Sequence, residues 1–229
     1  PAIEAIEYAE RIFSTEINSA TDNPLIVDDG EGGYLSISGG HFHGQYMAQA
    51  LDFLAIAVAD LGAICERRLA RLIDPAMSYG LPRNLLAGRR GLNTGYATVQ
   101  CSLSALVMEN RGLATPGSVD TIPGKGNAED HVSNSTWCGR KARTVVANAE
   151  QIVAGELLMA AQALTLVEPL AKDFPLGKGT RAAFEAIRAV VPPALDGDRW
   201  YATEMRDALA FVRSGAVADA VEAAVGALE

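Results

Sequence analysis

Two very long stretches of helical periodicity constrain most strongly what this chain can fold into. Residues 44–74 and 130–167 repeat apolar side chains at three- and four-residue spacing, and neither stretch contains a proline. A helix of thirty residues is about 45 Å long, which exceeds the span of an ordinary small domain. Both stretches carry apolar residues on more than one face, so each helix needs several neighbours. The pattern predicts an all-α protein, a bundle of long helices shared between the subunits of an oligomer.

Shorter elements surround these two stretches. Residues 2–17 and 96–113 also have helical periodicity, and residues 34–38 form a candidate strand. Pro75 and Glu168-Pro169 supply stop signals for the two long helices. A terminal helical segment, residues 178–229, completes the chain as three shorter helices with a proline-rich break at 190–200.

Charge and cysteine content narrow the function classes. The formal net charge of −9, without any basic cluster, argues against nucleic acid as a partner. Cys65, Cys101 and Cys138 show neither pairing nor metal-type spacing, which favours a reducing cytoplasm. No apolar run is long and uninterrupted enough for a membrane span, and no signal-peptide pattern occurs. We therefore expect a cytoplasmic protein that binds neither nucleic acid nor membrane.

The stretch "GGHFHG" holds two of the three histidines of the chain, His41 and His43, on either side of Phe42. Two histidines at this spacing can bind zinc from a strand, but a zinc site needs three or four ligands. His131 is the one remaining histidine, and no Cys or carboxylate stands at a matching short spacing. The residues favour the alternative, in which the imidazoles cap or cross-link a turn through hydrogen bonds.

The stretch "GKGNAEDHVSN" has a structural and a functional interpretation. Asn127 and Asp130 form a capping pattern for the second long helix, and acidic residues in a first turn suit the helix dipole. Alternatively, Glu129 faces a pocket, where burial would raise its pKa for acid–base work. The sequence does not choose between them.

The stretch "NSATDNPL" allows the same two interpretations. Asp22 and Asn23 before Pro24 predict a turn, because proline fixes the backbone and restricts the residue before it. An asparagine held in such a turn can also offer its amide to a ligand. Periodicity does not decide the matter here either.

Taken in order along the chain, six motifs resemble the aromatic amino acid ammonia-lyase family. This family includes histidine, phenylalanine and tyrosine ammonia-lyases and the related aminomutases. The resemblance runs from the first helix to about residue 165 and continues weakly through "DRWYATEM"; "SVDTIP" and "EDHVS" look closest to the histidine ammonia-lyase branch. The six motifs are "NSATDNPL", "GGHFHG", "ERRLARL", "GLNTGY", "SVDTIP" and "NAEDHVS".

The resemblance implies an α-helical tetramer whose active sites are built from more than one subunit. The electrophile of the family is methylidene-imidazolone, which forms from an internal Ala-Ser-Gly and captures the substrate. A base then removes a β-proton, and ammonia leaves to give an α,β-unsaturated acid.

The same resemblance assigns residues to roles. Asn23 falls where the family places an amide near the electrophile, and Phe42 falls where a phenylalanine lines the substrate pocket. Glu129 falls where histidine lyases carry glutamate and the phenylalanine and tyrosine lyases carry glutamine. On this basis Glu129 is the candidate catalytic residue. Asn127 and Ala128, beside it, join Phe42 and Asn23 as candidate substrate-binding residues, and His41 and His43 become supports of the Phe42 turn.

Some positions depart from the family pattern. Ala128 replaces a glutamine close to the substrate, and His41 replaces an asparagine. Arg83 and Asn84 stand where the family usually has Pro-Phe. The changes at residues 83, 84 and 128 leave open which amino acid is the substrate, since they allow a bulkier or differently polar one than histidine.

No Ala-Ser-Gly occurs in these 229 residues, nor do the family's catalytic tyrosine loop and Tyr-Ser-Leu-Arg segment. The chain therefore resembles the C-terminal portion of a lyase over residues 1–229. We expect the electrophile to come from a complementary N-terminal chain, in a tetramer-like assembly with further copies. Two alternatives remain: a 2,3-aminomutase of the same family, and a non-catalytic helical subunit that stabilises or regulates a full-length lyase.

Overall fold

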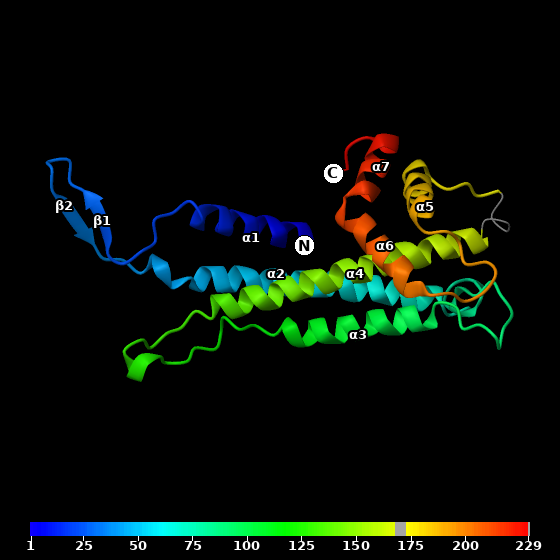
Figure 1. Ribbon diagram of the computed structural model, residues 1–229, viewed down its shortest axis with the longest axis horizontal. Coiled ribbons are helices and arrows are strands. Elements are labelled where there is room, and N and C mark those ends of the chain that lie inside the picture. The colour runs from blue at the N-terminus through cyan, green and yellow to red at the C-terminus, as the bar shows by residue number, and fades with distance from the viewer. Residues whose placement is uncertain (168–172, 229) are drawn as a thin grey trace. The chain divides into compact units, whose positions relative to one another are not determined.

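The computed structural model describes residues 1–167 and 173–228 and divides them into two compact units. Unit 1 comprises residues 1–60 and 110–146, and unit 2 comprises residues 61–109 and 147–229. Helices account for most of both units (Figure 1), so the all-α prediction is confirmed. The two longest helices, α2 (Gln45–Leu72) and α4 (Ser135–Val167), each contribute residues to both units.

Unit 1 begins with helix α1 (Ala2–Glu16) and a small antiparallel hairpin. Strand β1 (Leu25–Asp28) pairs with β2 (Tyr34–Ile37). The chain then enters the 3-10 turn η1 (His41–His43), and Gly44, with a φ of 77°, turns it into α2. Figure 1 shows α1 running along α2, where the rings of Tyr8 and Phe53 lie 5.8 Å apart.

Helix α4 begins at Ser135, five residues later than the capping pattern predicts. The capping interpretation of Asn127 and Asp130 was therefore wrong. Residues 130–134 bond to the loop before them instead of continuing a helical turn: the backbone N–H of Val132 donates to Thr121 Oγ1 at 2.8 Å. Glu168-Pro169, the predicted stop signal of this helix, lies outside the described residues.

Unit 2 contains α3 (Ala97–Leu113) as far as Glu109, together with α5 (Lys178–Val190), α6 (Tyr201–Arg213) and α7 (Ala216–Val225). Helix α5 packs against α7 and α6 (Figure 1). The core of this unit consists of large apolar side chains from α2, α3, α4 and α5, among them Leu69, Leu103, Ile152, Leu158, Met159 and Ile187.

By length and composition alone, the helical segments 41–72 and 135–167 are sufficient to cross a membrane. The expectation that no apolar run is long enough was therefore wrong by this criterion. Protein already buries 39% and 44% of their most apolar 18-residue windows. Long apolar helices packed in this way are also typical of the core of an all-α bundle.

Candidate active site

An open pocket of about 460 Å³ lies in unit 1 between the η1 turn and the loop that precedes α4. Phe42 and His43 line one side of it, and residues 128–133 line the other. The structure thus brings together three of the five predicted site residues, Phe42, Ala128 and Glu129. The two segments that carry them are far apart in the sequence.

His43 cross-links the two sides of this pocket. Its Nε2 lies 2.8 Å from the carbonyl oxygen of His131 and 3.2 Å from His131 Nδ1, and the two rings are 5.0 Å apart. An Nε2–H group of His43 can donate to either acceptor. The cross-linking interpretation of the histidines is confirmed for His43. Phe42, next to it, keeps 55% of its surface exposed toward solvent.

Glu129 stands at the end of a tight turn. Its backbone carbonyl accepts a hydrogen bond from Gly124 N at 2.7 Å, and Asn127 N donates to Gly124 O at 3.0 Å. Asn127 adopts a φ of 67° and shapes this turn, while the pocket lining begins at the next residue, Ala128. Glu129 lines the pocket but is exposed, so the burial that its acid–base hypothesis requires is not provided by this chain.

Asn23 lies outside the pocket, at the base of the hairpin. Its Oδ1 accepts hydrogen bonds from Ser38 Oγ at 2.9 Å and from Gly39 N at 3.3 Å. These bonds fix the carboxamide and tie the turn before β1 to the chain that leaves β2. Because Oδ1 is held in this way, the direction of the Nδ2 group is set as well. Ser38 and Gly39, which hold it, belong to the segment that leads into the Phe42 turn.

A buried ion pair beneath the pocket loop was not anticipated from the sequence. Asp52, on α2, and Lys141, on α4, are each 3% exposed, and their Oδ1 and Nζ atoms lie 2.7 Å apart. The second oxygen, Asp52 Oδ2, accepts hydrogen bonds from the backbone N–H groups of Gly117 and Ser118, each at 2.8 Å. The sequence held one signal for this pair: Asp52 is the one charged residue in the apolar stretch "ALDFLAIA", and a buried acidic side chain needs a partner.

The electrostatics of this pair favour its charged state. Burial by itself would raise the pKa of Asp52, but hydrogen bonds from Lys141 and from Ser118 outweigh it and hold the pKa below its usual value. Cys138 donates to Asp52 Oδ2 at 3.4 Å. Burial, followed by the nearby Asp52 charge, raises the pKa of its thiol to about 11. The loop is therefore attached to a carboxylate that stays ionised at neutral pH.

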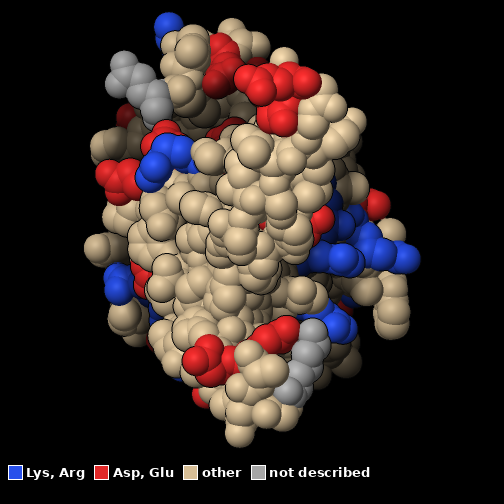
Figure 2. Space-filling view, turned by 90° about the vertical axis from the view of Figure 1, so that its left-hand side faces the viewer, with Lys and Arg blue, Asp and Glu red and all other residues tan. Residues whose placement is uncertain are grey.

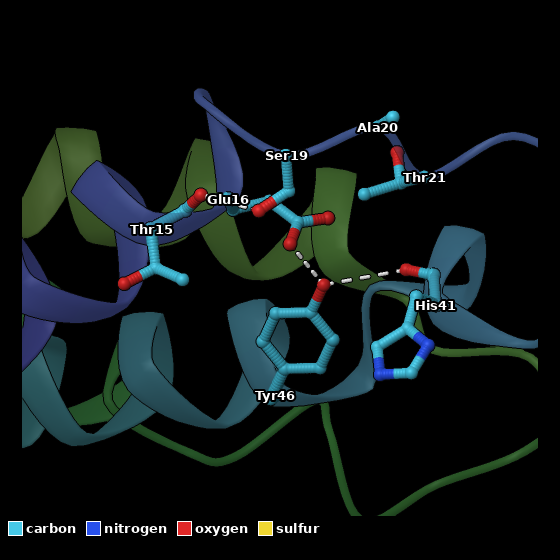
Figure 3. Close-up of a pocket in the computed structure, with 7 residues that line it drawn as sticks. All are labelled: Thr15, Glu16, Ser19, Ala20, Thr21, His41 and Tyr46. Atoms are coloured by element: carbon cyan, nitrogen blue, oxygen red, sulfur yellow. Dashed lines mark hydrogen bonds between the residues drawn. The ribbon is translucent and has the colours of Figure 1, made fainter. Parts of the chain in front are cut away.

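A second pocket of unit 1, of about 450 Å³, is lined by His41 of the η1 turn, by Tyr46 and by residues at and after the end of α1 (Figure 3). Tyr46 donates from its hydroxyl to the Glu16 carboxylate and, at 3.3 Å, to the carbonyl oxygen of His41. The bond to Glu16 raises the pKa of Tyr46. His41 lines this pocket while His43 faces the other one, so the two histidines do not converge. Within residues 1–167 and 173–228, no three His, Cys, Asp or Glu side chains come together as a metal ion would require.

Comparison with known protein families gives a match over most of this chain. The model of the family described as "Aromatic amino acid lyase" matches residues 1–189. This chain belongs to the aromatic amino acid lyase family. The resemblance inferred from the six motifs is confirmed.

Individual lyases are similar to this chain over nearly all of it. The histidine ammonia-lyase of Symbiobacterium thermophilum is 48% identical over 225 residues, and that of Caenorhabditis elegans is 46% identical over 218 residues. These alignments cover 98% and 95% of this chain but 42% and 31% of the two relatives. The chain therefore spans less than half of the length of either lyase.

Solved structures of the family share the fold. The crystal structure of histidine ammonia-lyase from Trypanosoma cruzi, at 41% identity, superposes with a TM-score of 0.87 and covers 98% of this chain and 42% of its own. The tyrosine aminomutase from Streptomyces globisporus, at 34% identity, also gives 0.87, with coverages of 97% and 41%. Both lyases and aminomutases are thus built on this arrangement of helices.

Proposed function

We propose that this chain forms one wall of the active site of an amino acid ammonia-lyase acting on an aromatic, histidine-like amino acid. The product is an α,β-unsaturated acid. The observation that carries this proposal is the pocket in which Phe42 and Glu129 meet from two separate segments. Its support is the family membership of the chain and its similarity to histidine ammonia-lyases.

Each pocket residue has a role that follows from its chemistry. The half-exposed ring of Phe42 offers an apolar wall against an aromatic side chain. The Glu129 carboxylate either accepts a hydrogen bond from a ring N–H of the substrate or transfers a proton. Ala128 leaves space beside Glu129, and Asn127 shapes the turn that presents both.

The electrophile comes, in this proposal, from outside these residues. Their sequence contains no Ala-Ser-Gly from which a methylidene-imidazolone can form. When present, that group supplies the electrophilic carbon that captures the substrate. Asn23 fits a supporting role toward it, because Ser38 and Gly39 hold Oδ1 and so orient the amide Nδ2.

We assign the electrophile to a complementary N-terminal lyase chain, in a cytoplasmic, tetramer-like assembly with further copies of both. Unit 1 leaves large apolar side chains exposed, which suits a chain that packs against others. Figure 2 shows charged residues in separate groups, with uncharged residues over most of the visible surface between them. The three free cysteines agree with a reducing compartment.

A denaturing intact-mass spectrum of the natively purified particle tests the assembly. The expected result is a second chain whose mass is two waters below its encoded value, as formation of the electrophile requires. If this polypeptide is found without any second chain and without that mass deficit, the proposed lyase is refuted. A non-catalytic helical subunit would then be the better description.

Substitution of Glu129 by glutamine separates its two roles. The assembled enzyme would be assayed for ammonia release from histidine, which has a ring N–H, and from phenylalanine, which has none. A ring-binding Glu129 predicts a loss of kcat/KM for histidine, because an amide oxygen accepts more weakly than a carboxylate, and little change for phenylalanine. An acid–base role predicts a loss for both, on the order of 10²- to 10⁴-fold. Unchanged turnover of both amino acids would remove Glu129 from the mechanism.

A 2,3-aminomutase is the second candidate, favoured by the tyrosine aminomutase structures that share this fold at 34–35% identity. Such an enzyme returns ammonia to the β-carbon. Product analysis distinguishes the two, because a lyase accumulates the unsaturated acid and free ammonia while an aminomutase accumulates a β-amino acid.

A further inference from the structure

The pocket loop, residues 114–134, has few apolar contacts of its own. Val119 and Ile122, its large aliphatic residues in the first half, are 79% and 65% exposed. A loop that buries so little apolar surface depends on polar contacts for its shape. The position of Glu129, near the end of this loop, therefore depends on those contacts as well.

Asp52 holds the beginning of the loop. Its Oδ2 accepts the N–H groups of Gly117 and Ser118, while Lys141 donates to Oδ1 and also to the carbonyl oxygen of Thr115. Gly117 also packs closely against α4, since a Cβ at this position would lie only 2.8 Å from Cδ1 of Trp137. One carboxylate thus joins α2, α4 and the loop at a single buried point.

Further hydrogen bonds extend from this point toward the pocket. The Asn134 amide Nδ2 donates to the carbonyl oxygens of Gly117 and Asp120. Thr121 Oγ1 accepts from Val132 N at 2.8 Å, and Gly124 N donates to the carbonyl oxygen of Glu129. These hydrogen bonds connect residues 117 and 118 with both halves of the loop.

We propose that Asp52 is a positioning residue of the active site: its carboxylate, neutralised by Lys141, holds the loop that places Glu129 in the pocket. The inference rests on the proposed function for the role of Glu129. Asp52 lies on α2 beneath the loop and is absent from the pocket lining, so it acts through Glu129 and not on the substrate.

Two double variants of the assembled enzyme isolate the loop contact from the buried charge. The first combines Asp52→Ala with Lys141→Met, and the second combines Asp52→Asn with Lys141→Met. Both remove the ion pair, and neither leaves an unpaired buried charge. They differ in that asparagine keeps an oxygen able to accept from Gly117 and Ser118.

Hydrogen–deuterium exchange of peptides within residues 119–134 is the first readout. The alanine variant should exchange faster at the amides of Gly124 and Val132, while the asparagine variant retains protection close to that of the wild type. Peptides within residues 61–109, in unit 2, serve as the internal control and should not change. Equal exchange of loop residues 119–134 in the two variants would overturn the inference.

Turnover is the second readout, and it distinguishes positioning from general stability. Misplacement of Glu129 in the alanine variant should reduce kcat on the order of 10- to 100-fold, with recovery in the asparagine variant. In a Glu129→Gln background the alanine variant should cause little further loss, because residues that act through one group are not additive. Full additivity would contradict a role through Glu129. Absence of turnover in the wild-type assembly overturns the proposed function, whereas the exchange comparison still decides whether Asp52 orders the loop.

Discussion

The two units of this chain bury different kinds of side chain. Unit 2 packs leucine, isoleucine, methionine and tyrosine into a continuous core, whereas unit 1 buries mainly alanines, such as Ala5, Ala48 and Ala55. Of the twelve largest fully buried side chains described, only Val145 belongs to unit 1. Unit 2 is thus held by a core of large apolar side chains, whereas unit 1 buries few side chains of that size.

The candidate site lies in the unit with the weaker apolar core. Its pocket loop is attached through Asp52 and Lys141 and cross-linked to the Phe42 turn through His43 and His131. Hydrogen bonds fix direction as well as distance, which suits a loop that must present one carboxylate. Stability and site geometry are thus carried by separate parts of this chain.

The largest effect is expected from the core of unit 2. Leu158 is fully buried within it, so Leu158→Ala should lower the free energy of unfolding by about 2–5 kcal/mol. Urea denaturation followed by circular dichroism measures this loss. The corresponding change in unit 1, Val145→Ala, should cost less, because valine is smaller than leucine and Val145 lies outside the continuous apolar core. An equal or greater cost for Val145→Ala would show that the apolar core of unit 1 contributes as much to stability as that of unit 2.

The buried thiols provide a reporter for each unit. Cys138 in unit 1 and Cys65 in unit 2 are both buried, and burial is the main reason that their pKa values rise to about 11 and about 12. Neither thiol reacts readily at neutral pH unless its surroundings open. We expect iodoacetamide to modify exposed Cys101 first, Cys138 next and Cys65 last, as measured by peptide mass mapping. Modification of Cys65 before Cys138 would show that unit 2 opens more easily.

The smallest effect on the isolated chain is expected at the hairpin. Leu35, on β2, is 54% exposed, so Leu35→Ser should change the free energy of unfolding by no more than about 0.5 kcal/mol. If another chain covers this surface, Leu35→Ser should weaken assembly of the particle more than it lowers the stability of the isolated chain. Analytical ultracentrifugation of the particle, with and without the substitution, checks this. A large loss of stability in the isolated chain would show that the hairpin contributes to the core of unit 1 after all.

Local spacing and motif order were readable from the sequence. Helices α2 and α3 lie within two residues of their predicted bounds, since apolar periodicity and Pro75 are properties of the chain itself. The six motifs and their order also indicated the family, because each motif can be recognised from its own residues without knowledge of the fold. The start of α4 was predicted wrongly: Thr121 and Asn134 bond residues 130–134 and their neighbours to the loop, and a local capping pattern does not contain that information.

Contacts between residues far apart in the chain follow from the fold. The pocket needs Phe42 beside Glu129, the cross-link needs His43 beside His131, and the loop needs Asp52 beside Lys141. These contacts join segments far apart in the chain, so no spacing rule along the sequence predicts them. The helices and the family could be predicted from the sequence alone, because periodicity and motifs are local. The geometry of the site was decided by packing, because hydrogen bonds and ion pairs form only where the fold brings both partners within reach.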